Sequence, residues 1–110
     1  HIPWSQTVIA GFSQGGAMTI DVARQFPVAG LICMSGYLHD DLTPVDSPPP
    51  TLIVHGQFDP VVPLEQAQAL KSTLESWNTT VFYQEFAMGH EITPAAIATI
   101  RKFILKVCFS

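Results

Sequence analysis

Charged side chains are scarce in this 110-residue chain, where Asp, Glu, Lys and Arg together make up 13%. A globular domain usually has about twice that share, roughly 25%. The net charge is −4 with only five basic residues, so we expect no nucleic-acid partner. No apolar stretch approaches the roughly 20 residues of a membrane-spanning helix, so we expect no membrane span. The 47% of hydrophobic residues therefore predicts elements covered on both faces, as parallel strands under helices are.

Cysteine is also scarce. Cys33 lies in an apolar run and Cys108 near the C-terminus, a spacing that fits no metal site. We interpret both as reduced thiols rather than a disulfide, which favours a cytoplasmic protein. The first residues show no signal-peptide pattern, and 110 residues leave room for one domain.

Apolar runs alternate between strand-like and helix-like segments. The pattern predicts strands at 7–10, 30–35, 51–55 and 81–86, and helices at 14–26, 64–77 and from 94 onward. In the last helix, Ile97, Ile100 and Ile104 are expected to share one apolar face. Prolines make 39–50 an irregular connection, because proline cannot sit inside a sheet. Alternation of strands and helices predicts an α/β fold with about four parallel strands and flanking helices.

A serine between two glycines follows the first predicted strand. Residues 11–15 read Gly-Phe-Ser-Gln-Gly and precede a run that can form a helix. This is the pattern of a nucleophile elbow, a sharp turn that holds the serine in a strained conformation above the sheet. We expect the glycines on either side of Ser13 to leave room for the turn. The helix would then direct its N-terminus at developing negative charge.

Two other predicted strands end in loops that hold a carboxylate and a histidine. Asp59 follows the strand at 51–55, and His90 follows the strand at 81–86. Functional loops leave the carboxyl ends of parallel strands, so both are expected near Ser13. A serine nucleophile needs a base, and the base needs an anion to fix its tautomer. Serine, acid and histidine in this chain order indicate an α/β-hydrolase.

Four motifs carry a resemblance to a known family. They are Gly11-Phe12-Ser13-Gln14-Gly15-Gly16, Ser35-Gly36-Tyr37-Leu38, the run HGQFDPVVP at 55–63, and Met88-Gly89-His90-Glu91-Ile92. In this order they resemble the phospholipase/carboxylesterase family, which includes small bacterial carboxylesterases and the acyl-protein thioesterases, which are also lysophospholipases. The resemblance implies Ser13 as nucleophile, Asp59 as orienting acid and His90 as general base. It also implies the backbone N–H of Gln14 as an oxyanion-hole donor.

The chain departs from that family in length. Members are roughly twice as long, and their second oxyanion donor comes from a His-Gly-Gly-type loop after an early strand. That loop does not occur here. We therefore expect residues 1–110 to form a single, partial α/β-hydrolase domain that lacks the N-terminal strands. Its first strand would have an exposed edge, which invites pairing with a second copy.

Each candidate residue has an alternative. Ser13 could be an ordinary turn serine, and Asp59 could cap its own loop. The other aspartates lie in a helix or in the proline-rich connection: Asp21, Asp40, Asp41 and Asp46. Among the other histidines, His1 is terminal, His39 could rim the site and His55 would have a structural part. Glu91 is expected to be solvated or to support a hydrogen bond.

Five apolar side chains on these loops could line an acyl pocket or belong to the core: Tyr37, Leu38, Phe58, Val61 and Met88. An apolar pocket without a basic cluster favours a small-molecule ester or an acyl-lipid as substrate. We expect a serine hydrolase that cleaves carboxylic esters through an acyl-enzyme on Ser13, without a metal or cofactor. The competing hypothesis is a catalytically inert, truncated fragment that forms a homo-oligomer through its exposed sheet edge.

Overall fold

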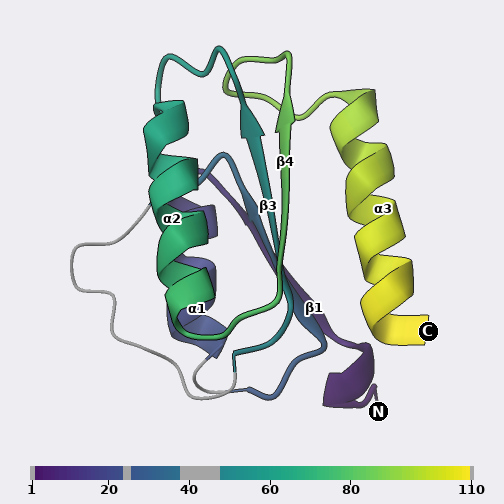
Figure 1. The fold of residues 1–110 in the computed structure, drawn as a ribbon. Coiled ribbons are helices and arrows are strands. Elements are labelled where there is room, and N and C mark those ends of the chain that lie inside the picture. Colours follow the sequence, from purple (N-terminus) through teal and green to yellow (C-terminus); the bar gives the residue numbers. More distant parts are fainter. Residues whose placement is uncertain (1, 24–25, 38–47, 110) are drawn as a thin grey trace.

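Four short apolar segments form a parallel sheet in the computed structural model, which describes residues 2–23, 26–37 and 48–109. The strands are β1 (Val8–Phe12), β2 (Gly30–Met34), β3 (Thr51–Gly56) and β4 (Val81–Phe86). They lie in the order β1-β2-β3-β4, and all three pairs are parallel. Their carboxyl ends consequently lie at one edge of the sheet, at the top of Figure 1.

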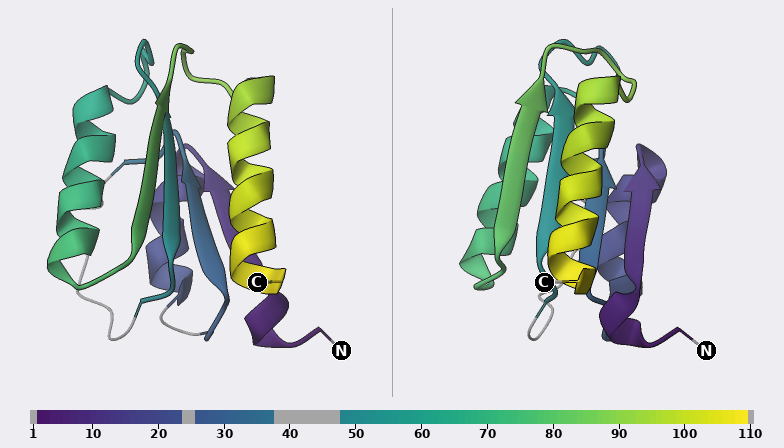
Figure 2. Two further views of the ribbon diagram at one scale, coloured as in Figure 1. Left: turned by 45° about the vertical axis from the view of Figure 1, so that its right-hand side comes forward. Right: turned by 90° about the vertical axis from the view of Figure 1, so that its right-hand side faces the viewer.

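Helices cover both faces of this sheet (Figures 1 and 2). Helices α1 (Gln14–Ala23) and α2 (Leu64–Ser76) lie on one face, and α3 (Pro94–Phe109) lies on the other. A short 3-10 helix, η1 (Trp4–Gln6), precedes β1 and contacts α3. Among the described helices, none is long and apolar enough to cross a lipid bilayer.

The core consists of two layers because successive strand residues point to opposite faces. Leu31, Cys33 and Ile53 pack against α1 and α2, while the alternate residues Ile32 and Leu52 pack toward α3. Every residue of β3 is buried. Both faces of the central strands are therefore covered, which confirms the prediction drawn from the low charge content.

The strands and helices predicted from the sequence occur within a few residues of the expected bounds. One expectation about α3 is wrong, because Ile97 does not share the buried face with Ile100 and is 56% exposed. Ala96 and Phe103 are the fully buried residues of this helix. Each helical residue is rotated about 100° from the one before it. A stripe through positions 96, 100, 103 and 107 therefore turns position 97 toward solvent.

The strand β1 forms one edge of the sheet, as the sequence predicts. Within the described residues no strand pairs with its outer side. Several large apolar side chains before, on and after it are exposed: Ile2, Trp4, Phe12, Met18 and Phe26. An unpaired edge strand flanked by exposed apolar side chains is a surface on which another strand can pair.

Room for the turn between β1 and α1 comes from Gly11, and the expectation for Gly15 is wrong. A Cβ on Gly11 would lie 2.2 Å from the Gly15 carbonyl oxygen. A Cβ on Gly15 would meet nothing within 4 Å outside its own stretch of helix, whereas one on Gly16 would lie 3.0 Å from the Gly11 oxygen. The turn folds the first helical residues onto β1, so space is restricted at positions 11 and 16.

This geometry predicts opposite effects for two alanine substitutions. Gly11→Ala forces backbone atoms apart, so we expect it to lower the free energy of unfolding by about 1–3 kcal/mol or more. Gly15→Ala adds a methyl group in open space inside a helix, where alanine is favoured over glycine by roughly 0.5–1 kcal/mol. Chemical denaturation of both variants measures the difference. Equal destabilisation by the two substitutions would contradict the assignment.

Candidate active site

The turn after β1 holds Ser13 in an unusual backbone conformation. Its φ angle is 57°, in the left-handed region that residues other than glycine seldom adopt. Its N–H donates to the Met34 carbonyl at 2.8 Å, and its own carbonyl accepts from the Ala17 N–H at 3.1 Å. The turn is thus fixed to β2 on one side and to α1 on the other. Such local strain is typical of functional positions.

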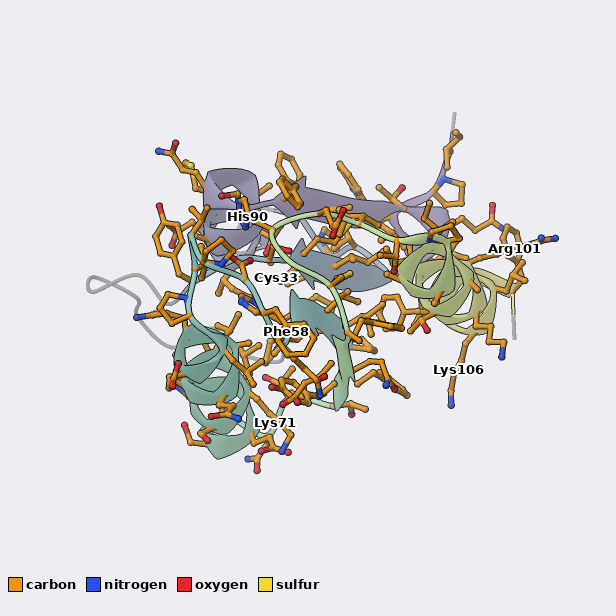
Figure 3. All side chains as sticks on the ribbon, turned by 90° about the horizontal axis from the view of Figure 1, so that it is seen from above. Cys33, Phe58, Lys71, His90, Arg101 and Lys106 are labelled. Carbon is orange, nitrogen blue, oxygen red and sulfur yellow. The ribbon has the colours of Figure 1, made fainter. Side chains whose placement is uncertain are left out.

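His90 joins this turn to the loop after β3. It lies between β4 and α3, and its Nε2 is 3.0 Å from the Ser13 Oγ. Its Nδ1 is 2.7 Å from the Asp59 Oδ2. The imidazole ring also packs against the ring of Phe12, with 4.8 Å between centroids. Figure 3 looks down on this end of the sheet, with His90 labelled.

Asp59 is the buried member of the three, with 8% of its surface exposed. Its Oδ1 accepts hydrogen bonds from the N–H groups of Val61 and Val62, both at 2.8 Å. Burial acts to raise the pKa of the Asp59 carboxyl. The bonds from the Val62 amide, His90 and the Val61 amide outweigh burial, so that the pKa lies below its ordinary value of 3.8. The carboxylate is therefore held in its charged form beside the imidazole.

His55 lies beneath the Asp59 loop and is fully buried. Its Nε2 is 2.7 Å from the Val62 carbonyl oxygen and 3.7 Å from the Asp59 Oδ2. The second distance is too long for a hydrogen bond. Its Nδ1 is buried without a hydrogen-bond partner among the described residues. The sequence pattern indicates only a structural part for His55, and the contact with Val62 has no motif that would reveal it.

Glu91 and Cys33 lie close to these three residues, but neither is placed to act as a nucleophile or base. Glu91 accepts a hydrogen bond from the Gly89 N–H at 3.3 Å and so supports the His90 loop. Cys33 is buried behind the Ser13 turn, where its thiol donates to the Gly16 carbonyl at 3.2 Å. Burial raises the pKa of this thiol to about 12, so it is a poor nucleophile. Cys33 and Cys108 are both free.

Four of the five residues considered for an acyl pocket lie in the described part of the chain, and they differ in exposure. Phe58 and Val61 are exposed on the loop after β3, at 70% and 63%. Met88 is buried in the core layer beneath α3. Tyr37 is half-buried after β2, and Leu38 lies outside the described residues. A hollow of about 210 Å³ lies elsewhere, beside α3 and β4.

Ser13, His90 and Asp59 can together transfer a proton from a hydroxyl to an imidazole. Within the described part of the chain, no group of three His, Cys, Asp or Glu side chains could hold a metal ion. The first N–H groups of a helix have no partner within it, and the first residue of α1 is Gln14. Its backbone N–H therefore lies beside the serine, where an anion could be bound.

Comparison with known proteins supports a hydrolase family. The family model described as Phospholipase/Carboxylesterase matches residues 1–108. Acyl-protein thioesterase 1 of Mycosarcoma maydis is 31% identical over 96% of this chain and 50% of its own length. Acyl-protein thioesterase 1 of Gibberella zeae is 28% identical, with 90% of this chain and 47% of that protein covered. The chain thus spans about half the length of the curated relatives that it matches.

Solved structures show the same fold. SOBER1 of Arabidopsis thaliana superimposes with a TM-score of 0.84 at 25% identity, covering 96% of this chain and 54% of that one. A phospholipase/carboxylesterase from Dyadobacter fermentans gives a TM-score of 0.77 at 29% identity, with 94% and 54% covered. The matched family model, the four parallel strands and these structures agree. The chain belongs to the phospholipase/carboxylesterase family of α/β-hydrolases.

Proposed function

We propose that this chain carries the catalytic triad of a serine hydrolase that cleaves carboxylic esters, with Ser13 as nucleophile, His90 as base and Asp59 as acid. The observation that carries the proposal is the continuous hydrogen-bond chain through the three side chains, at 3.0 Å and 2.7 Å. A turn serine or a loop-capping aspartate would need no such alignment. The strained φ of Ser13 supports the same assignment.

The reaction follows from the positions of the three groups. His90 Nε2 takes the Ser13 hydroxyl proton as Oγ forms a bond to the substrate carbonyl carbon. The imidazolium is stabilised through Nδ1 by the ionised Asp59. Collapse of the tetrahedral intermediate breaks the bond to the alcohol, which leaves with the proton from His90 Nε2. A water molecule activated by the same nitrogen then hydrolyses the acyl-enzyme, and Ser13 regains its proton. No step needs a metal or cofactor.

The oxyanion of the tetrahedral intermediate is stabilised by the Gln14 N–H at the start of α1. The family's second donor comes from a loop whose sequence does not occur in this chain. Loss of one such donor costs on the order of 10²–10³ in turnover. We therefore expect slow turnover by these 110 residues, well below that of a protein with both donors.

The proposed substrate class rests on the apolar side chains of the loop that holds Asp59. The exposed Phe58 and Val61 present apolar surface on the loop that holds Asp59. Apolar contacts of this kind suit a small neutral ester or an acyl-lipid. The names of the curated relatives favour thioesters as further substrates. Two free cysteines fit a reducing compartment, and we place the protein in the cytoplasm.

A second role, self-association without catalysis, is favoured by the open edge of β1. The hydrogen bonds of Ser13 N–H to Met34 and of Ala29 N–H to the Thr7 carbonyl show which residues face β2. Residues of a parallel strand alternate in the side to which they bond. The N–H groups of Val8 and Ala10 consequently face outward, ready to pair with a strand of a second copy.

Replacement of the nucleophile tests the catalytic proposal. We expect Ser13→Ala to reduce hydrolysis of a short-chain nitrophenyl ester to the uncatalysed background. We expect a fluorophosphonate to label the wild-type chain on the peptide that contains Ser13. Ser76→Ala is the control, because it removes an exposed hydroxyl on α2 that bonds within its helix. It should keep both the ester hydrolysis and the fluorophosphonate labelling. Equal rates for wild type and Ser13→Ala, with no labelling, would refute the proposal.

The ionised state of Asp59 gives a pH dependence of stability. Its pKa in the folded chain lies below 3.8, so the unfolded chain binds more protons in this range. The stabilisation is complete above pH 3.8 and is lost as the pH falls through the lower folded value. We expect Asp59→Asn to flatten the fall in unfolding free energy as the pH drops below about 4. Denaturant titrations measure this, and parallel curves for the two chains would contradict it.

Self-association is tested at an outward-facing position of β1. Ala10→Pro removes an N–H that faces away from β2 and therefore breaks edge pairing without a loss of β1–β2 bonds. We expect wild type to elute as a multimer in size-exclusion chromatography and Ala10→Pro to shift toward the monomer. Ala10→Val keeps the N–H and serves as control. A monomeric wild-type chain, or a multimer unchanged in a folded Ala10→Pro chain, would exclude this edge.

A further inference from the structure

We infer that His55 is a positioning residue for the triad, which fixes the Asp59 carboxylate by holding the Val62 carbonyl. This inference rests on the proposed function, because it assigns the cause of the acid's orientation. His55 does not touch the reacting atoms, since its hydrogen bond goes to the loop backbone. Its effect on Ser13 passes through Asp59 and His90.

The first step is the anchoring of the loop between β3 and α2. Its first half is bound through the backbone, because Gln57 N–H donates to the Phe86 carbonyl at 2.8 Å and Phe58 N–H to the Met88 carbonyl at 3.1 Å. In its second half, the Val62 carbonyl is held by the fully buried His55 side chain at 2.7 Å. The carbonyl can only accept, so the Nε2 of His55 carries the proton.

In the second step, the backbone of Val62 connects His55 to Asp59. Its carbonyl accepts from His55, while its N–H donates to the Asp59 Oδ1 at 2.8 Å. The neighbouring Val61 N–H donates to the same oxygen at 2.8 Å. Both lone-pair directions of Oδ1 are thereby occupied, and Oδ2 is turned toward His90 at 2.7 Å. A shift of the Val62 peptide would rotate the carboxylate away from the imidazole.

The third step concerns charge. The described ionisable groups that face His55 are Asp59, 3.7 Å from its Nε2, and Glu85, its register partner on β4. Glu85 is itself hydrogen-bonded to Gln57 and to Tyr83. Because the Nε2 proton points at a backbone carbonyl, the Asp59 Oδ2 is left to His90. A donor that reached Oδ2 directly would compete for the bond that orients the base.

Three variants separate positioning from simple packing. His55→Leu removes the donor and leaves the Val62 carbonyl buried without it. His55→Gln places an amide N–H near the former Nε2, whereas the shorter His55→Asn cannot reach that far. Thr51→Val is the matched control, because Thr51 is fully buried on the same strand and bonds a backbone carbonyl, that of Pro49 at 3.1 Å, at the opposite end of β3.

Two readouts are measured on chains shown to be folded by circular dichroism. The first is the Ser13-dependent rate of nitrophenyl ester hydrolysis. We expect a loss of about 10–100-fold in kcat/KM for His55→Leu and His55→Asn, as misplacement of about 1 Å costs on this order. The kcat/KM of His55→Gln should be at least tenfold higher than that of His55→Leu, and the kcat/KM of Thr51→Val should match wild type. The second is the low-field proton resonance of the His90 Nδ1–H bonded to Asp59, which should persist in His55→Gln and Thr51→Val and vanish in His55→Leu.

The outcomes distinguish this inference from the proposed function. A wild-type chain without Ser13-dependent turnover refutes the proposed function, yet the resonance still tests the role of His55. A folded His55→Leu chain that keeps both turnover and resonance overturns the positioning role. If His55→Leu does not fold, the comparison of His55→Gln with His55→Asn decides, and equal behaviour of the two overturns it. Absence of the resonance from wild type overturns it as well.

Discussion

The parallel pairing of β1, β2, β3 and β4 decides where every reactive group of this chain can lie. Because all four strands run in one direction, the loops after β1, β3 and β4 leave the sheet at a single edge. Side chains 77 positions apart in the sequence, Ser13 and His90, thereby reach 3.0 Å. Reversal of β3 or β4 would carry Asp59 or His90 to the opposite end of the sheet, and no adjustment of the loops could restore the contact.

The hydrogen bonds that allow the Asp59 carboxylate to be buried also fix its orientation. A buried carboxylate is unfavourable unless donors surround it, and Asp59 meets two backbone amides and one imidazole. The amides occupy one oxygen, so the other is available to His90 alone. The bonds that stabilise the charge are therefore the same bonds that orient the His90 imidazole, the proposed base. Val62 is in turn hydrogen-bonded to His55, which lies in β3, a strand that is buried along its whole length.

Much of this arrangement could be predicted from the sequence, because strand-to-helix alternation and three loop motifs fix the order of the elements. What could not be predicted depends on distances between backbone segments. In the turn around Ser13, Gly16 rather than Gly15 is the second crowded glycine, because a Cβ there would meet the Gly11 carbonyl oxygen, a contact that the motif does not encode. Ile97 is exposed because the buried stripe of α3 runs through Ala96 and Phe103, which turns position 97 toward solvent. The contact of His55 with Val62 requires a loop path that no periodicity reveals.

The strand that presents the proposed nucleophile is also the open edge of the sheet, so the proposed oxyanion stabilisation would depend on what pairs with β1. A strand that paired in parallel with the outward groups of Val8 and Ala10 would end beside Ser13, and the loop after it could supply an N–H to the oxyanion. A strand paired antiparallel would begin there instead, and its turn would lie in the space above Ser13 that the substrate needs. The direction of pairing at β1 therefore separates a partner that would complete the proposed active site from one that would block access to it.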